Sequence, residues 1–263
     1  MTIIWRGLAL AGLAFVSHAA RAQAVGAQAA DSGEWTFRIA PYLWGTAIDG
    51  NVAHENLPID FHAGLGFDDV WENLDIGAMG AFEARKGRYG VLADGLYAKL
   101  STTAYAPVPG MALPVRLKTR TATGLLAFRY GWRQSDTGHL DFIAGMRVWS
   151  ARTRLAYSIP VPVPPPIPQQ YAGEQEHRWV DLQLGVKGRH GFSNGSFVGG
   201  WVLAGAGESD LSTDVMLIAG YDINDRVSVV AGYRWLSTDY ETSGGFRFDT
   251  TMQGPGLGLE YLF

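Results

Sequence analysis

The sequence predicts an all-β protein: a transmembrane, antiparallel, up-and-down β-barrel of about ten strands, with eight or twelve as alternatives. Three observations predict it. The chain opens with an export signal, apolar and polar residues then alternate with a period of two, and no later apolar run approaches the roughly 18 residues of a transmembrane helix. The composition agrees, with 34 Gly, 9 Trp, 11 Tyr and only 17% charged residues.

The first segment, residues 1–24, has the order of a secretory signal peptide. Arg6 provides a positive start, residues 7–16 are apolar, and Ala22-Gln23-Ala24 forms an A-x-A cleavage pattern. We therefore expect a mature chain that begins near Val25, with a short lead at 25–33 and the barrel at 34–263. The sequence contains no cysteine, so it offers no disulfide and no thiolate chemistry.

The charge of the mature chain disfavours nucleic acid as a partner. Removing residues 1–24 takes away Arg6 and Arg21 and no acidic residue, so the formal net charge moves from −4 to −6. Proteins that bind nucleic acid normally present a basic face.

Alternation is clearest in the middle and at the end of the chain. Leu140, Phe142, Ala144, Met146 and Val148 alternate with more polar or smaller residues, and Leu257, Leu259, Tyr261 and Phe263 do the same. A transmembrane barrel requires one apolar face towards lipid and one polar face towards the lumen. The predicted strands are 34–48, 73–86, 88–103, 115–133, 139–157, 177–189, 196–207, 212–222, 226–240 and 246–263.

The connections between these strands alternate in length. Short polar turns at 86–88, 134–138, 190–195 and 222–225 alternate with links at 49–72, 104–114, 158–176, 208–211 and 241–245. Short periplasmic turns and longer outer loops are the rule for such barrels, so both termini are expected on the periplasmic side.

Two of the longer links have a distinct character. Residues 159–168 read IPVPVPPPIP, which favours a stiff, extended outer loop over a segment that presents a ligand. Residues 57–75 are apolar and acidic together, and Phe67 to Trp71 could form a short helix with acidic residues in its first turn. We expect that helix to be a rim structure rather than a substrate lid.

A soluble β-sandwich is the competing fold, because its strands alternate as well. The export signal, the even strand count and the asymmetry of the connections favour the barrel.

The chain resembles a group of uncharacterised bacterial outer-membrane β-barrel proteins labelled porin-like. The resemblance covers nearly the whole mature chain and is carried by Trp35-Thr36-Phe37, Ala40-Pro41-Tyr42-Leu43-Trp44, Glu72-Asn73-Leu74-Asp75, Gly80 to Arg85, Ala93 to Tyr97, Ala144 to Arg147, Trp179-Val180-Asp181, Gly232-Tyr233-Arg234 and Gly254 to Gly258. Where those relatives have a Gly-Phe-Gly-rich turn before Ser-Asp, this chain has Gly205-Ala206-Gly207-Glu208-Ser209-Asp210. The resemblance implies a fold and a location in the outer membrane of a Gram-negative cell envelope, but no substrate.

The end of the chain resembles the insertion signal of such barrels. Phe263 is the last residue, and Tyr261 lies on the same face. The expected partners are therefore outer-membrane lipid and the barrel-assembly machinery, together with a small solute or ligand whose identity the sequence does not specify.

A search for enzyme chemistry gives no strong candidate. His54, His62, His139, His177 and His190 form no His pair at metal-ligand spacing, and we find no G-x-S-x-G and no P-loop. A rim-sited hydrolase is kept as an unsupported alternative; its candidate residues would be His54, His62, Asp68, Asp69, His177, Asp210 and Asp239. We expect no enzyme, no cofactor and no metal.

The informative charges are those that alternation places in the lumen. They are Arg38, Glu83, Arg85, Asp94, Arg129, Asp141, Arg147, Asp181, Lys187, Arg234 and Glu260. Six are basic and five acidic, and such a balance favours mutual pairing because a buried unpaired charge is very costly. We therefore expect a largely closed, ion-paired lumen and a structural, adhesive or small-ligand-binding role. A narrow porin-like channel for small solutes is the alternative, since Gly77, Gly145, Gly185, Gly232, Gly254, Gly256 and Gly258 leave room inside.

Overall fold

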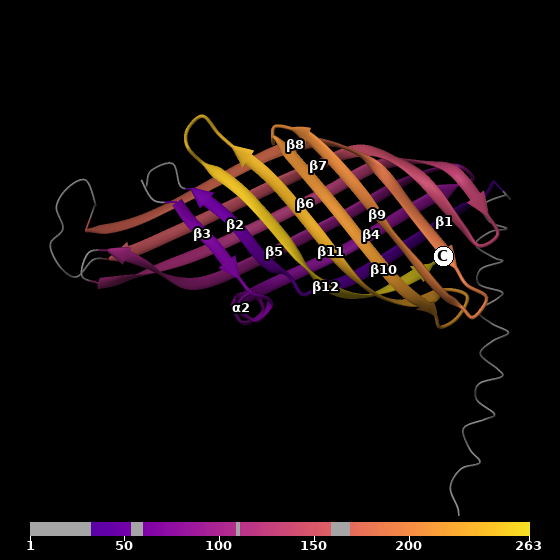
Figure 1. Ribbon diagram of the computed structural model, residues 1–263, viewed down its shortest axis with the longest axis horizontal. Helices are drawn as coiled ribbons and strands as arrows, with labels where there is room; N and C mark the ends of the chain where they lie inside the picture. The colour runs from indigo at the N-terminus through magenta and orange to yellow at the C-terminus, as the bar shows by residue number, and fades with distance from the viewer. Residues whose placement is uncertain (1–32, 54–59, 109–110, 159–168) are drawn as a thin grey trace, which may run out of the picture.

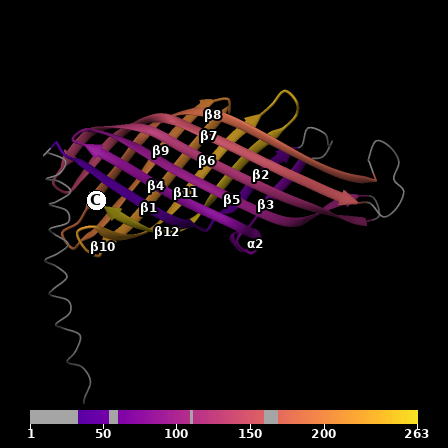
Figure 2. The same ribbon diagram turned by 180° about the vertical axis from the view of Figure 1, so that it is seen from behind.

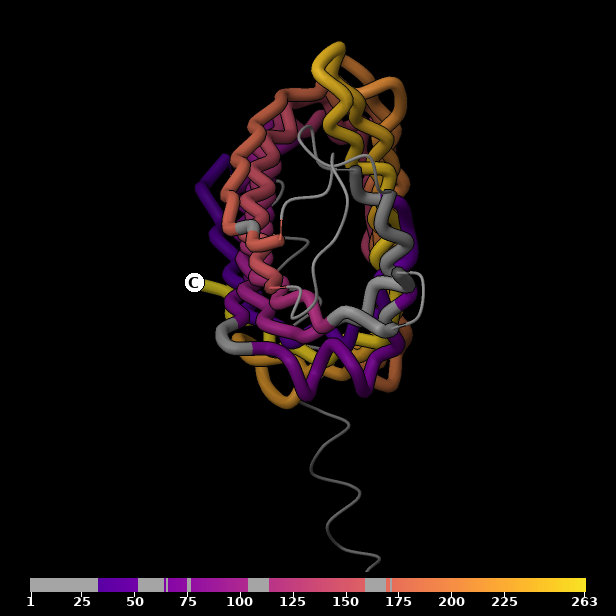
Figure 3. Tube along the Cα trace, turned by 90° about the vertical axis from the view of Figure 1, so that its left-hand side faces the viewer, coloured from indigo at the N-terminus to yellow at the C-terminus, as the bar shows by residue number. Residues whose placement is uncertain are grey.

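The chain forms a closed antiparallel β-barrel of ten strands, as the sequence predicts (Figure 1). The computed structural model describes residues 33–53, 60–108, 111–158 and 169–263. The predicted signal peptide and the 159–168 loop lie outside these residues. Viewed along the axis, the strands form a complete ring (Figure 3). Within the described residues, no helix is long and apolar enough to cross a membrane.

The ten barrel strands follow the predicted segments in order. They are β1 (Trp35–Trp44), β4 (Leu74–Lys86), β5 (Tyr89–Val108), β6 (Met111–Ser135), β7 (Gly138–Ser158), β8 (Gln170–Gly191), β9 (Ser196–Gly207), β10 (Leu211–Asp222), β11 (Val227–Glu241) and β12 (Arg247–Leu262). Each pairs with its neighbour in sequence, and β1 closes the ring by pairing with both β4 and β12. At the closure, the amides of Phe37 and Phe263 each donate to the other's carbonyl oxygen, at 3.0 and 2.9 Å.

The predicted loop at 49–72 is wrong in part, because it contains a hairpin. β2 (Ala47–Ala53) and β3 (Asp60–Leu65) pair with each other, and β2 continues the line of β1 along the outer half of β12. β2 reads AIDGNVA, with Asp, Gly and Asn at its centre, and these residues are depleted in strands. The register therefore comes from β12, whose outer backbone groups would otherwise be left as an open edge.

The predicted links at 104–114 and 158–176 are also corrected, since much of each is strand. β5, β6, β7 and β8 have 20, 25, 21 and 22 residues and extend past the other strands, as the view from behind shows (Figure 2). Most of the described outward-facing residues of these extensions are polar or charged, among them Arg116, Lys118, Arg152, Arg154 and Glu174. Alternation between an apolar and a polar face therefore fades, and with it the signal that the prediction used.

The short helix at Phe67 to Trp71 is confirmed as α2 (Phe67–Asn73). Asp69 stabilises its first turn by accepting a hydrogen bond from the Gly66 amide at 3.0 Å. The expected place at the rim is wrong, because α2 contacts β2, β3 and β5 about halfway along the barrel wall (Figure 1).

The outward face of the barrel carries a broad apolar belt. Leu126, Met146, Leu182, Leu217 and Leu257 are each at least half exposed although they are large and apolar. Aromatic residues border the belt at the end where the short turns lie: Trp35, Tyr89, Trp132, Tyr221, Tyr261 and Phe263. An exposed apolar band bordered by aromatic residues is the kind of surface that a bilayer requires.

Candidate functional site

Charged and aromatic side chains inside the lumen form layers that are stacked along the barrel axis. The layer nearest the short turns centres on Arg129, which is fully buried and pairs with Glu83 and Asp141. Glu83 also pairs with Lys187, so one carboxylate on β4 joins cations from β6 and β8.

A second group of charges lies at the same end. Glu260 pairs with Arg189 at 2.5 Å and with Arg38 at 3.7 Å, and Asp222 lies 3.6 Å from Arg189. The Arg189 guanidinium also covers the ring of Phe197, 3.3 Å from its centroid, which is a cation–π arrangement.

The packing of Phe197 against Gly220 gives a prediction. A Cβ on Gly220 would collide with the Phe197 ring, whereas a Cβ on Gly95 would meet nothing within 4 Å. We expect Gly220→Ala to lower the free energy of unfolding by about 1–3 kcal/mol because the ring must shift. Gly95→Ala is the matched control and should change it by less than about 0.5 kcal/mol. Equal midpoints of urea unfolding for the two variants would contradict this packing.

The middle layer is a charge network centred on Arg234. Its guanidinium donates to Asp214 at 2.7 and 3.0 Å, to Asp94 at 2.6 Å and to the Tyr42 hydroxyl at 2.6 Å. Tyr42 in turn donates to Asp94 at 2.8 Å, and Arg147 pairs with the same Asp214. The four charged members are at most 3% exposed. The network therefore lies in a section of the lumen from which water is largely excluded.

An aromatic layer follows on the outer side. Trp149 and Trp179 stack with ring centroids 5.7 Å apart, and Tyr240 stacks on Trp179 at 4.3 Å. Both tryptophans are fully buried, and Phe248 packs against both. Large rings from β7, β8, β11 and β12 thus pack against one another inside the lumen.

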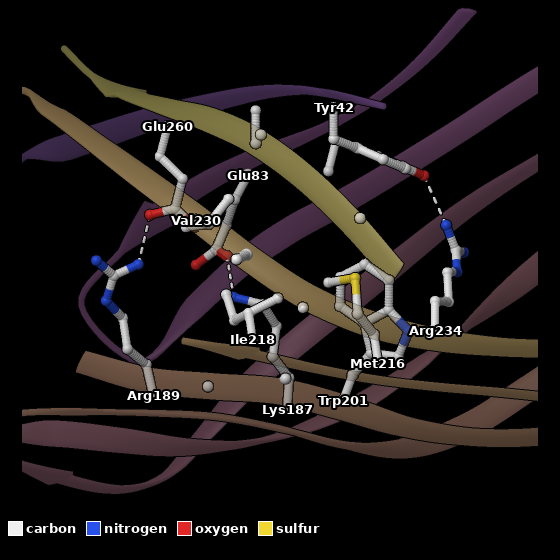
Figure 4. A pocket seen from close by; sticks show the side chains of 18 of the residues that line it. Tyr42, Glu83, Lys187, Arg189, Trp201, Met216, Ile218, Val230, Arg234 and Glu260 are labelled. Carbon is white, nitrogen blue, oxygen red and sulfur yellow. Dashed lines mark hydrogen bonds and ion pairs between the residues drawn. The ribbon is translucent and has the colours of Figure 1, made fainter. Parts of the chain in front are cut away.

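A cavity of about 100 Å³ lies between the charges near the short turns and the Arg234 network (Figure 4). Ala40, Met216, Ile218 and Val230 give it apolar walls, while Glu83, Lys187, Arg189 and Glu260 lie at one end and Tyr42 and Arg234 at the other. Of the seven glycines expected to leave room, Gly232, Gly256 and Gly258 line it.

The structure places the eleven predicted lumen charges as follows. Glu83, Arg129, Asp141, Lys187, Arg38 and Glu260 lie in the two groups near the short turns, and Asp94, Arg147 and Arg234 lie in the middle network. Asp181 is fully buried and accepts a hydrogen bond from the Ser209 amide at 3.0 Å. Arg85 is half-buried, and its Nε donates to the Gly87 carbonyl at 3.2 Å.

Sequence reasoning missed five members of these networks, one of which is Tyr42, bonded to Asp94 and Arg234. Asp214 joins Arg147 to Arg234, Asp222 and Arg189 belong to the Glu260 group, and His139 lies 3.5 Å from Asp141. Arg189 carried a usable signal, because it lies two residues after Lys187 on the same strand face. Asp214 did not, because β10 has apolar residues on both faces beyond it.

Among the described candidates for a rim hydrolase, Asp210 and Asp239 are neighbours, with the Asp210 amide donating to the Asp239 carbonyl oxygen at 2.8 Å, whereas His177 and Asp239 face opposite sides of the barrel wall. His177 faces inward and stacks on Phe246 at 3.8 Å, whereas Asp239 lies between the inward-facing Thr238 and Tyr240 and so points outward. Asp68 and Asp69 belong to α2, Asp210 is exposed beside β10, His54 lies outside the described residues, and the side chain of His62 is not described. In the part of the chain that the structure describes, no group of three or more His, Asp or Glu side chains could hold a metal ion.

A closed antiparallel barrel with an apolar outer belt and a polar, charged interior defines a class: the protein is an outer-membrane β-barrel. Comparison with solved structures finds the same fold. The outer-membrane protease OmpT of Escherichia coli matches with a TM-score of 0.55 and 11% sequence identity, over 88% of this chain and 98% of that one.

Other solved barrels are more distant. The translocator domain of the autotransporter NalP from Neisseria meningitidis matches with a TM-score of 0.45 and 13% identity, over 97% of each chain. Ail, the attachment invasion locus protein of Yersinia pestis, matches with a TM-score of 0.36 and 9% identity, over 87% of this chain and 98% of that one. No family model and no curated protein matches the chain in sequence. At such low identities the comparisons establish the fold alone.

Proposed function

We propose that the protein is a non-conducting, non-enzymatic outer-membrane barrel whose interior is a structural core and whose function is carried by its surface-exposed end. The observation that supports this most directly is the pair of filled layers across the lumen. The Arg234 network and the Trp149–Trp179 stack lie one above the other, and their charged groups and indole rings are almost completely buried.

The charge balance of the lumen fits a core better than a pore. A diffusion channel selects ions by a surplus of one sign along a hydrated constriction. Here Arg234 and Arg147 balance Asp94 and Asp214, and Arg129 and Lys187 balance Glu83 and Asp141. Paired charges in a site with little water stabilise one another and leave no net field to attract an ion.

The long strands provide the surface for an adhesive or ligand-binding role. β5 to β8 continue past the apolar belt. β5 and β6 remain paired out to Val108↔Met111, and β7 and β8 remain paired out to Ser158↔Gln170. A paired sheet of this length holds its outward side chains in fixed rows above the membrane. Such a wall suits recognition at the cell surface, and the sealed lumen stiffens it from within.

The test is electrical. We expect purified wild-type protein, refolded and inserted in a planar bilayer, to show no stable single-channel steps, while an open sixteen-stranded porin in the same bilayer does. Stable, ion-selective steps from the wild-type barrel would overturn the closed-lumen proposal in favour of the narrow channel.

One observation favours a second candidate, the binding of a small ligand in the lumen. The cavity of about 100 Å³ has apolar walls and charged ends, so a compact molecule with an apolar body and a polar end would match it. The polar end of such a ligand would bind Glu83, Lys187 or Arg189, at the end of the cavity nearer the short turns.

A further inference from the structure

A basic surface lies on the outward side of the long strands. It consists of Arg116, Lys118 and Arg120 on β6, Arg152 and Arg154 on β7, and Arg178 on β8. These positions alternate with inward-facing residues such as Thr121, Thr153 and Trp179, so all six side chains point away from the lumen.

The strand registers set these cations side by side. Lys118 lies opposite Arg154, and Arg120 lies opposite Arg152 on one side and Lys99 on the other. Like charges directly opposite each other on neighbouring strands destabilise a sheet. Because the fold alone disfavours these opposed cations, their arrangement suggests that a bound anion offsets the repulsion between them.

Two carboxylates neutralise only one side of this surface. Glu176 pairs with Arg152 and Arg178, and Glu174 pairs with Arg152 at 3.4 Å and Arg154 at 2.9 Å. Arg116, Lys118 and Arg120 are exposed, and no carboxylate of the described residues lies within ion-pair distance of them. Positive charge therefore remains unbalanced along β6.

The height of the surface relative to the apolar belt limits what it can bind. Along β8, the outward residues Leu184, Leu182 and Val180 are followed by Arg178, and along β7 the belt ends at Val148, two positions before Ser150 and four before Arg152. The basic surface thus begins where the lipid-facing belt ends, at the depth of the outer headgroups.

The opposite wall shows that this charge is not a general property of the rim. On β11 and β12 the outward residues at the same end include Asp239, Glu241 and Asp249, with Asp239 directly opposite Asp249. Arg247, which lies on the same face of β12, pairs with Glu241 at 3.0 Å.

We propose that the basic surface binds the phosphorylated headgroup of an outer-leaflet lipid. By strand geometry its core covers about 10 Å across three strands and about 13 Å along them, which accommodates a sugar headgroup carrying more than one phosphate. Arginine forks bind phosphate oxygens in bidentate fashion, and the acyl chains of the same lipid lie against the belt below. This contiguity favours a lipid over a soluble anion, and the proposal holds whether or not the lumen conducts.

The experiment compares charge-removing triples in the refolded full barrel. Diphosphoryl lipid A, titrated in zwitterionic detergent, is expected to bind wild-type protein and to raise its unfolding temperature. The variant Arg116→Gln/Lys118→Gln/Arg120→Gln should bind about 100-fold more weakly, since each basic residue near an anionic surface contributes about a fivefold factor. The control Lys86→Gln/Arg88→Gln/Arg133→Gln removes the same charges from the periplasmic end and should bind like wild type.

A further variant and three further probes make the outcome decisive. Glu174→Gln/Glu176→Gln frees Arg152, Arg154 and Arg178, so it should bind diphosphoryl lipid A more tightly than wild type, and this result does not depend on a weakened variant remaining folded. The proposal is overturned if the control triple loses as much affinity as the β6 triple. It is equally overturned if phosphatidylcholine or inorganic phosphate gives the same stabilisation, or if heparin displaces the lipid at equal charge concentration.

Discussion

Replacing Arg234 with alanine is expected to lower the free energy of unfolding of the barrel by about 3–5 kcal/mol. The guanidinium is the only group that contacts Asp94, Asp214 and Tyr42 together among the described residues. Removing it leaves two carboxylates in a section of the lumen where both are at most 3% exposed. Urea unfolding of the detergent-solubilised barrel, followed by tryptophan fluorescence, measures the loss.

A matched control separates this effect from the loss of any arginine. Arg133 lies on β6 near a short turn and is exposed, so Arg133→Ala should change the free energy of unfolding by less than about 0.5 kcal/mol. Arg147→Ala should fall between the two, because Asp214 would keep Arg234 as a partner. A water-filled lumen would screen these charges, so a small loss in Arg234→Ala together with altered ion selectivity would contradict the ion-paired core.

The sequence could predict which residues of each strand face the lumen, a property we call strand parity. Once a strand's outward face is recognised as apolar, every second residue must face inward, and this rule places Arg129, Arg147, Asp181 and Arg234 correctly on the inner wall. What parity cannot give is the partner across the lumen. Arg147 and Asp181 are neighbours in register on β7 and β8, yet Arg147 pairs with Asp214 on β10.

The missed hairpin has a different physical cause. A strand that spans the membrane carries its own apolar face, whereas β2 and β3 lie above β1 at the outer half of the wall. Their pairing depends on the exposed outer edge of β12, from Arg247 to Gln253. That edge exists because the regular pairing of β1 with β12 ends at Trp44 and Gly256, followed by one further hydrogen bond from the Gly45 amide to the Pro255 carbonyl oxygen. No local pattern in residues 47–65 indicates that they pair with this distant strand edge, so reasoning from the local sequence assigns a loop.

Deleting Tyr261, Leu262 and Phe263 is expected to reduce the yield of folded barrel at least about tenfold, because a sheet edge left open in lipid exposes unpaired backbone groups that cost several kcal/mol each. The structure shows what these residues hold together. Tyr261 pairs with Ile39 on β1 and Val227 on β11, and Phe263 exchanges both backbone hydrogen bonds with Phe37. The stacked rings of Phe37 and Phe263, 5.7 Å apart, cover the same seam on the lipid side.

The measurement is the fraction of protein that resists unfolding in cold SDS, both after refolding into lipid and after expression in cells. Deletion of residues 26–31, which precede the first barrel strand, is the control and should leave that fraction near the wild-type value. Phe263→Ala separates the two roles of the terminus, since it keeps the backbone closure with Phe37 and removes only the ring. If Phe263 is also read as an insertion signal, Phe263→Ala should refold normally in the purified system but insert poorly in cells. Equal yields from the terminal deletion and the 26–31 deletion would show instead that the seam closes without the last three residues.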